Sequence, residues 1–264
     1  MFKQIILCLT VSLMFMVNVC WEGNSSGASQ SGKDNPKVDN KKDLVLVAGA
    51  TGRTGSLVVK TLLEKKYQVR AFVRDVMRAT KLLGPNVEYV EGDVRNMDSI
   101  RPAMQGVTKV ISAVGAFGKE ANNGPEQVDY NGVKNLVNAA SAAKIDQFVL
   151  ISSMGVTDED HVLNKMFDNV LIWKFKGEEA LRKSGVAYTI VRPGGLTDDE
   201  GEKKEVLFKQ GDTGTGFITR ADVARVCVAA LEIPEARNKT LEVIHGTNPP
   251  SKDWQALFSV LKPD

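Results

Sequence analysis

The sequence predicts an α/β fold in which a parallel sheet is covered by helices on both faces, the doubly wound arrangement. From about residue 43 onward, short apolar runs rich in β-branched residues alternate with stretches whose apolar residues recur at helical spacing. Strands separated by helices in this way lie parallel and are joined by right-handed crossovers. A glycine-rich segment, VAGATGRTG, includes the end of the first apolar run. Its position, between a strand and a helix, is typical of the same class of fold.

Each apolar run is short enough for a strand, and each periodic stretch is long enough for a helix. Strands are expected at 44–48, 68–73, 87–93, 107–114, 146–153 and 186–193. Helices are expected at 55–66, 76–84, 97–105, 126–143 and 168–184. Further along, the segments EVLF and TLEVIHG are expected to be strands on either side of a helix that holds Arg220 and Asp222, and SKDWQALFSVL a closing amphipathic helix.

The residues ahead of this alternation differ from it in composition. Residues 1–22 hold Lys3 and then an uncharged apolar run, which fits a cleaved signal peptide or an uncleaved membrane anchor. Residues 23–42 contain no Leu, Ile, Phe or Met, and therefore cannot bury enough surface to offset the entropy of ordering. We expect them to be a disordered linker, so that the folded domain spans residues 43–264.

Composition excludes several classes of function. The formal net charge is +2 and no block of Lys and Arg forms a basic face, so we expect no nucleic-acid partner. Cys227 is the single cysteine of the predicted domain, which allows no disulfide within it. It lies in the periodic stretch ADVARVCVAAL and is expected to be a core residue. His161 and His245 are the only histidines, and without a Cys or His cluster no metal site is expected.

The glycine-rich segment predicts a binding site for a nucleotide's phosphates. Gly49 allows a tight turn, Gly52 allows the backbone to approach a pyrophosphate, and Gly55 allows the helix to pack on the strand. Amide groups at the helix start face the anion and the helix dipole favours it. The cofactor-binding residues predicted in this loop are Gly49, Ala50, Thr51, Gly52, Arg53, Thr54 and Gly55.

The end of the second strand bears on which nucleotide is bound. A free ribose 2′-hydroxyl usually meets an acidic residue there, whereas this chain places Arg74 at the tip and Asp75 after it. Arg74 and Arg53 would suit a 2′-phosphate, because a guanidinium donates two parallel hydrogen bonds. We therefore expect NADP, with NAD the less favoured alternative that Asp75 leaves open. The remaining cofactor contacts are expected from Asp93 and Val94 near the adenine, and from Ala113, Val114 and Gly115 near the nicotinamide ribose.

Six segments resemble one known family. GATGRTG, AFVRD, EGDVRN, SSMGV, WKFKGEEALRKSGVAYTIVRPGGLTD and ITRADVARVCVAAL are similar to the atypical short-chain dehydrogenases/reductases with an NAD(P)H-binding, NmrA-like domain, especially those of plants and algae. The resemblance covers residues 43–264. It implies a Rossmann fold, NADP binding and a small substrate-cleft region formed by the C-terminal part. It does not specify a reaction, because relatives include reductases, redox sensors and assembly factors.

The same resemblance implies an unusual catalytic helix. Typical members have a Tyr four residues before a Lys, and the Lys lowers the pKa of the phenol beside the nicotinamide. Lys174 takes the lysine position here, yet Val170 stands four residues before it. Placing Lys176 there instead gives Ile172. The chain therefore lacks the usual proton donor in either register.

Other polar residues are candidates for the catalytic site. Lys174 is expected to bond a nicotinamide ribose, and Ser152 and Ser153, which end a strand, to line the cleft. Turn and capping chemistry is an equal alternative for the two serines. Tyr130 is a further candidate acid, although such tyrosines more often pack against neighbouring side chains with the hydroxyl group hydrogen-bonded. Residues 192–195, RPGG, are expected to turn toward the substrate.

Two functions follow from these residues. The first is an NADPH-dependent oxidoreductase acting on a small carbonyl, quinone or flavin-like substrate, and the second is a non-catalytic NADP-binding redox sensor or assembly factor. The protein is expected to be a monomer or homodimer that contacts a membrane only if its first segment is uncleaved. The leader and two glycosylation sequons, at 24–26 and 238–240, favour the secretory pathway, in the ER lumen or outside the cell. The alternative locations are a plastid that the protein reaches through the ER, and a membrane to which its first segment anchors it.

Overall fold

The computed structural model describes residues 43–116, 122–250 and 253–264. The expected leader at 1–22 and linker at 23–42 lie outside these ranges. The described residues all belong to one compact unit. Among the helices of the described ranges, none combines the length and apolarity required to cross a bilayer.

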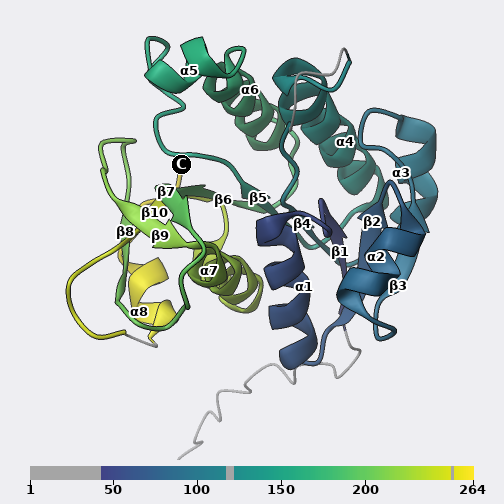
Figure 1. The fold of residues 1–264 in the computed structure, drawn as a ribbon, viewed down its shortest axis with the longest axis horizontal. Helices are drawn as coiled ribbons and strands as arrows, with labels where there is room; N and C mark the ends of the chain where they lie inside the picture. The colour runs from purple at the N-terminus through teal and green to yellow at the C-terminus, as the bar shows by residue number, and fades with distance from the viewer. Residues whose placement is uncertain (1–42, 117–121, 251–252) are drawn as a thin grey trace, which may run out of the picture. The chain divides into compact units, whose positions relative to one another are not determined.

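A central sheet has the strand order β3-β2-β1-β4-β5-β6-β10-β8 and is parallel except for β8, which runs antiparallel to β10 (Figure 1). A second sheet pairs β7 with β9. The strands are β1 Leu44–Ala48, β2 Gln68–Val73, β3 Glu88–Glu91, β4 Lys109–Ser112, β5 Gln147–Ile151, β6 Tyr188–Pro193, β7 Gly195–Thr197, β8 Val206–Lys209, β9 Phe217–Thr219 and β10 Lys239–His245.

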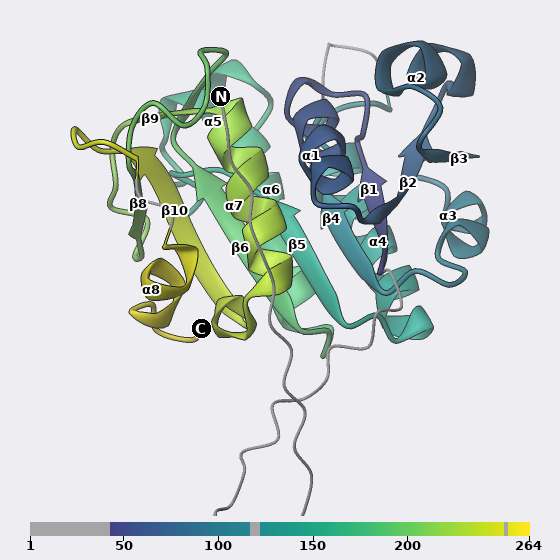
Figure 2. The ribbon, with the colours of Figure 1, turned by 90° about the horizontal axis from the view of Figure 1, so that it is seen from below.

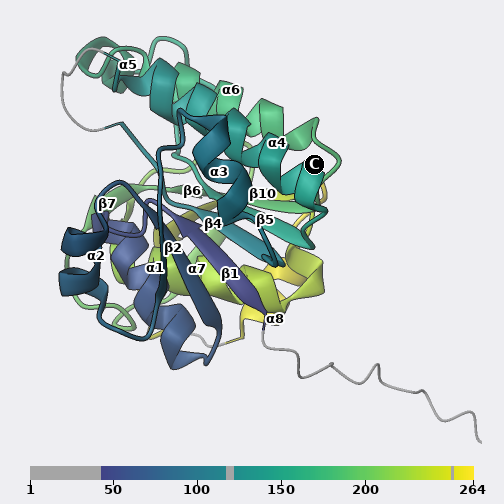
Figure 3. The same ribbon diagram turned by 90° about the vertical axis from the view of Figure 1, so that its right-hand side faces the viewer.

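Helices cover both faces of the central sheet. Figure 2 shows α1 and α7 side by side across one face, and Figure 3 shows α3, α4 and α6 on the opposite one. The α-helices are α1 Arg53–Glu64, α2 Val76–Leu83, α3 Met97–Ala103, α4 Val133–Ala143, α5 Val162–Met166, α6 Val170–Arg182, α7 Arg220–Glu232 and α8 Trp254–Ser259. A π-helix, η1 Glu126–Gly132, precedes α4, and a 3₁₀ turn, η2 Pro234–Ala236, precedes β10.

The sequence of β1 is apolar at every position because both faces of this strand are buried. Val45 and Val47 pack into the cluster beneath α1 and α7, whereas Leu46 and Ala48 pack into the cluster beneath α4. Successive side chains of a strand point to opposite faces, so a strand covered on both sides must be apolar at every position. Cys227, as expected, lies fully buried in α7, where burial raises the pKa of its thiol.

The predicted alternation of strands and helices is confirmed, with different boundaries. The strand expected at 107–114 is β4, Lys109–Ser112, because the chain leaves the sheet after Ser112 to form the site. The helix expected at 126–143 is divided into η1 and α4. Within the described ranges, helix α5, strands β7 and β9 and the 3₁₀ turn η2 were not expected.

The expectation for residues 192–195 needs correction. Arg192 does not turn toward a substrate: it lies in β6, 5% exposed, with its guanidinium on the carboxylate of Glu178. The chain turns at Gly194 and then continues as β7. Gly194 has no room for a side chain, because an added Cβ would lie 2.5 Å from the Gly216 carbonyl oxygen. The turn therefore serves the pairing of β7 with β9.

Candidate cofactor and active site

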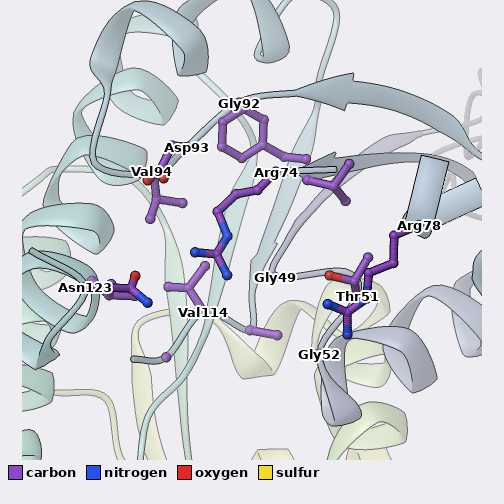
Figure 4. Close-up of a pocket in the computed structure, with 15 residues that line it drawn as sticks. Gly49, Thr51, Gly52, Arg74, Arg78, Gly92, Asp93, Val94, Val114 and Asn123 are labelled. Atoms are coloured by element: carbon purple, nitrogen blue, oxygen red, sulfur yellow. The ribbon is translucent and has the colours of Figure 1, made fainter. Parts of the chain in front are cut away.

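A cavity of about 330 Å³ lies at the carboxyl ends of β1, β2, β3 and β4 (Figure 4). The strand order reverses here, since β1 has β2 on one side and β4 on the other. Ligands of open α/β sheets bind at such a switch point. The cavity is lined by Gly49, Thr51, Gly52, Phe72, Val73, Arg74, Arg78, Gly92, Asp93, Val94, Ala113, Val114, Gly115, Asn123 and Val128.

The glycines of the first crossover are required by close backbone contacts. Gly49 has φ +77°, and an added Cβ would lie 2.6 Å from the Ala113 carbonyl oxygen. A Cβ on Gly55 would lie 2.1 Å from the Gly49 carbonyl oxygen. Gly55 thus allows helix α1 to pack closely on the turn, and Gly52 lines the cavity without a side chain.

The start of α1 is suited to an anion. Gly52 is the N-cap residue, and within the described chain no side chain bonds to the helix's first amides. The first turn also contains no acidic residue. The positive end of the helix dipole is therefore left for a ligand, and a dinucleotide's pyrophosphate fits this cradle in charge and in the space that a side chain would fill.

Two arginines enter the cavity beyond β2. Figure 4 shows the Arg74 side chain within the cavity and that of Arg78 reaching toward Thr51. Asp75 is absent from the described cavity lining, and its Oδ1 accepts a hydrogen bond from the Arg78 amide and caps α2. The sequence places Arg78 within the first turn of α2, but its role there was not predicted.

Arg53, which the sequence predicts beside a 2′-phosphate, has a different position from Arg74 and Arg78. Arg53 is absent from the described cavity lining and forms an ion pair with Asp198, which also pairs with Arg220 at 2.8 Å. The glycine-loop arginine is thus directed to the segment after β7. Ala50 is fully buried in the core and Thr54 lies in α1, so neither side chain lines this cavity.

Asp93 lines the cavity just beyond β3, where the sequence predicts the adenine. Hydrogen bonds from the Arg95 side chain, together with the Arg95 amide, hold the pKa of the Asp93 carboxyl below its usual value. The carboxylate is therefore ionised at neutral pH, with Oδ1 accepting from the Arg95 amide and Nε and Oδ2 accepting from the Arg95 Nη2. Val94 and Phe72 add apolar surface beside it, which suits a base with polar edges and apolar faces.

The opposite end of the cavity adjoins a smaller one, which includes Lys174 and Ser152. Lys174 Nζ lies 2.6 Å from Asp129 Oδ1, and the Asp129 side chain is fully buried. Ser152 is 6% exposed, and its hydroxyl has no partner among the described residues. The small cavity is lined by Val114, Asp129, Val133, Leu150, Ile151, Ser152 and Lys174.

Two of the predicted catalytic residues lie elsewhere. Ser153 donates its hydroxyl hydrogen to the Met154 carbonyl, which is the turn chemistry weighed for it above. The Tyr130 ring stacks on that of Trp173, with the ring centroids 6.0 Å apart, and Tyr130 lines neither of the two cavities of the described site. Ser152 and Lys174 are therefore the pair of predicted catalytic residues that the structure brings together.

Comparisons with known proteins agree with this geometry. A family model described as NAD(P)H-binding matches residues 49–234. Sanguinarine reductase of Eschscholzia californica is 38% identical over 264 residues, with 83% of this chain and 96% of that protein covered. An uncharacterised chloroplastic protein of Arabidopsis thaliana is 40% identical over 242 residues, with 81% and 74% covered. The structure of a putative NAD-dependent epimerase/dehydratase from Bacillus halodurans has a TM-score of 0.72 at 27% identity, with 83% and 100% covered.

The parallel sheet and the glycine cradle at its switch point define a dinucleotide-binding α/β protein. The family match and the relatives make the assignment narrower. The chain belongs to the NAD(P)H-binding family of atypical short-chain dehydrogenases/reductases, an oxidoreductase family with the Rossmann fold. The resemblance to the atypical short-chain dehydrogenases/reductases is thereby confirmed, and with it the binding of a nicotinamide cofactor.

Proposed function

We propose that the protein is an NADP(H)-dependent oxidoreductase that reduces a small carbonyl, quinone or flavin-like substrate. The proposal rests on the polar side chains found at the two ends of the site. Arg74 and Arg78 line the adenosine end, and Lys174 lies with the buried Ser152 hydroxyl beyond the nicotinamide end. One end would select the cofactor and the other would hold the reacting group.

The preference for NADP rests on charge. Two guanidinium groups lie at the end of β2, where a 2′-phosphate would lie, and each can donate parallel hydrogen bonds to its oxygens. The acidic residue that would accept from a free 2′-hydroxyl is Asp75, which caps α2 through Oδ1 and is absent from the described cavity lining. Both features favour the phosphorylated cofactor.

The chemistry proposed for the chain's own residues is limited to positioning and hydrogen bonding. The bound cofactor supplies hydride to the substrate. Lys174 would hold the nicotinamide ribose, and the Ser152 hydroxyl would donate a hydrogen bond to the substrate oxygen. The proton that completes the reduction would come from water or the substrate, because Val170 replaces the usual phenol.

The names of two relatives support a functional class and a cellular location for this protein. One relative is named a reductase, which supports turnover rather than binding alone. Another is named chloroplastic, which supports a plastid location for this protein. A secretory route remains an expectation from the first residues of the sequence, and sequencing the N-terminus of the protein isolated from its source would reveal whether a leader is removed.

Calorimetry followed by turnover assays tests the proposal. We expect NADPH to bind at least about tenfold more tightly than NADH, the effect of one charge-assisted contact. NADPH oxidation is then followed with a panel of quinones, flavins and small carbonyls, and turnover on any of them supports the proposal. Equal affinity for the two coenzymes would refute the NADP preference, and the absence of binding would refute the site itself.

A second function is favoured by one observation. The helix that carries Lys174 has Val170 in place of the phenol, and the nearby Tyr130 stacks on Trp173 instead of lining the cavity. A cofactor-binding redox sensor or assembly factor would need no proton donor. Tight NADPH binding without turnover on any acceptor of the panel would support this function over the first.

A further inference from the structure

The buried carboxylate of Asp129 contacts two different parts of the site. Its Oδ1 lies 2.6 Å from Lys174 Nζ on α6, and its Oδ2 accepts a hydrogen bond of 2.9 Å from the Ala116 amide, beyond β4. The segment that precedes Ala116, residues 113–115, lines the cofactor cavity. One side chain therefore joins the expected ribose-binding lysine to the cavity wall.

The local backbone brings Asp129 into this position. It lies in the π-helix η1, a conformation that is rare and concentrates at functional sites. Helix α6 approaches η1 so closely that a Cβ on Gly177 would lie 2.6 Å from the Asp129 carbonyl oxygen. The close approach of the two helices leaves the Asp129 side chain fully buried and the Lys174 side chain 19% exposed.

Burying the Asp129 carboxylate costs desolvation free energy, which its ion pair and hydrogen bond offset only in part. Replacing a buried ion pair with apolar residues of similar volume is often neutral or stabilising. Here Oδ1 contacts the Lys174 ammonium as an ion pair without hydrogen-bond geometry, and Oδ2 accepts a hydrogen bond from the Ala116 amide. The small cavity beside them also holds the Ser152 hydroxyl, which has no partner among the described residues. These contacts direct the lysine toward the reacting end of the site.

We propose that Asp129 is a positioning residue that acts through Lys174 and Ala116. It holds the Lys174 ammonium at the nicotinamide end of the cofactor cavity, and it holds the segment after β4 against the same cofactor. This inference rests on the proposed function, because it assumes that Lys174 contacts the cofactor's ribose. It assigns no proton transfer to Asp129.

The two oxygens allow the two contacts to be separated by substitution. Asp129→Asn removes the charge that attracts Lys174 but can keep an amide oxygen for the Ala116 amide. Asp129→Ala removes both contacts. Lys174→Met removes the ammonium and leaves a buried charge unpaired, so it carries a risk of poor folding. The double variant Asp129→Asn/Lys174→Met is neutral at both positions and removes that risk.

A double-mutant cycle on NADPH affinity tests whether Asp129 acts through Lys174. We expect Asp129→Asn and Lys174→Met each to weaken binding about tenfold, the value of one charge-assisted hydrogen bond. The double variant should bind NADPH about tenfold less tightly than the wild type, the same loss as for each single variant, because the two residues share one contact. Losses that multiply to about a hundredfold, or an Asp129→Asn variant with unchanged affinity, would overturn the inference.

Amide hydrogen exchange on the cofactor-free protein is the second readout. Exchange at Ala116 should be faster in Asp129→Ala and near that of the wild type in Asp129→Asn. Equal exchange in all three proteins would overturn the part of the proposal that concerns Ala116. Asp98→Asn, at a carboxylate 84% exposed on α3, is the matched control and should change affinity by less than about twofold.

These readouts distinguish failure of the inference from failure of the function. If the wild type binds neither coenzyme, the proposed function fails and this inference with it. If the wild type binds NADPH but turns over no substrate, the cycle can still be measured in full. Additive single effects in a protein that binds NADPH would overturn the role of Asp129 alone.

Discussion

The guanidinium of Arg192 donates two hydrogen bonds to the carboxylate of Glu178, with Nε 2.9 Å from Oε1 and Nη2 2.6 Å from Oε2. Arg192 lies in β6 and Glu178 in α6, and both are buried. The bidentate pair thus fixes the helix that carries Lys174 on the sheet. A second guanidinium, that of Arg182, donates to the same carboxylate at 2.9 Å.

Removing this carboxylate should destabilise the protein. Glu178→Ala removes both hydrogen bonds of the buried Arg192 guanidinium to this carboxylate and leaves it a longer contact with Asp212, at 3.9 Å. The expected loss in free energy of unfolding is about 3 to 5 kcal/mol. Glu179→Ala, at the next position of α6, removes a partly exposed carboxylate that pairs with Arg182 and should cost under about 1 kcal/mol. Denaturant unfolding of both variants measures the difference, and equal losses would contradict the assignment.

Cofactor preference should depend on Arg78 more than on Arg53. Arg78→Ala removes a guanidinium from the cavity and should reduce the ratio of NADPH to NADH affinity about tenfold. Arg53→Ala breaks an ion pair with Asp198 and should leave that ratio within about twofold of the wild type. Calorimetric titration with both coenzymes is the measurement. A larger change for Arg53→Ala would restore the role that the sequence suggested for it.

Gly55 should tolerate no side chain, in contrast to Gly115. A Cβ on Gly55 would overlap the Gly49 carbonyl oxygen at 2.1 Å, so Gly55→Ala must displace α1 from the turn and should weaken both stability and NADPH binding. At Gly115 the nearest atoms to an added Cβ lie 3.6 and 3.8 Å away, an ordinary contact. Gly115→Ala should therefore melt within a few degrees of the wild type, roughly the effect of a change under 1 kcal/mol. Similar melting temperatures for the two variants would disagree with this packing.

Stability should fall in acid partly through Asp222. Burial works to raise the pKa of this carboxyl, but hydrogen bonds from the Glu202 amide, His245, Thr219 and Arg225 lower it below its ordinary value. A lowered folded-state pKa means that the stabilisation is present above the unfolded-state pKa, about 4, and is lost as the pH falls through the folded value. Asp222→Asn should reduce the free energy of unfolding by about 1 to 3 kcal/mol at neutral pH.

The difference between Asp222→Asn and the wild type should shrink as the pH falls below about 4, because the wild-type carboxyl then becomes protonated as well. Urea unfolding at a series of pH values measures it. A difference that stays constant from neutral to acidic pH would show that the ionised form of Asp222 contributes nothing to stability.

Much of the fold could be predicted because its signals are local. An uninterrupted apolar run such as 44–48 and the periodic stretch after it can be read without knowledge of any distant residue. The elements that were missed, α5, β7, β9 and η2, are short and have weak patterns. The strands β7 and β9 depend on each other, since Leu196 pairs with Ile218 across a long separation in sequence.

The candidate site could be predicted where one segment supplies it. The glycine loop places Gly49, Gly52 and Gly55 in a fixed order between a strand and a helix, and their roles follow from that order. The partner of Arg53 could not be predicted in this way, because Asp198 approaches it from a different part of the chain. The same limit applies to Ser152 and Ser153, which are neighbours in the sequence but differ in burial and bonding.

Apolar periodicity and glycine spacing act over a few adjacent residues. They were therefore enough to predict the doubly wound parallel sheet and the bare-backbone turn between its first strand and first helix. The placement of Arg78 rather than Arg53 in the cavity with Arg74, and the pairing of Asp129 with Lys174, depend instead on how η1, α2 and α6 pack on the sheet. Asp129 and Lys174 are far apart in the sequence, and their ion pair forms because η1 and α6 pack against each other.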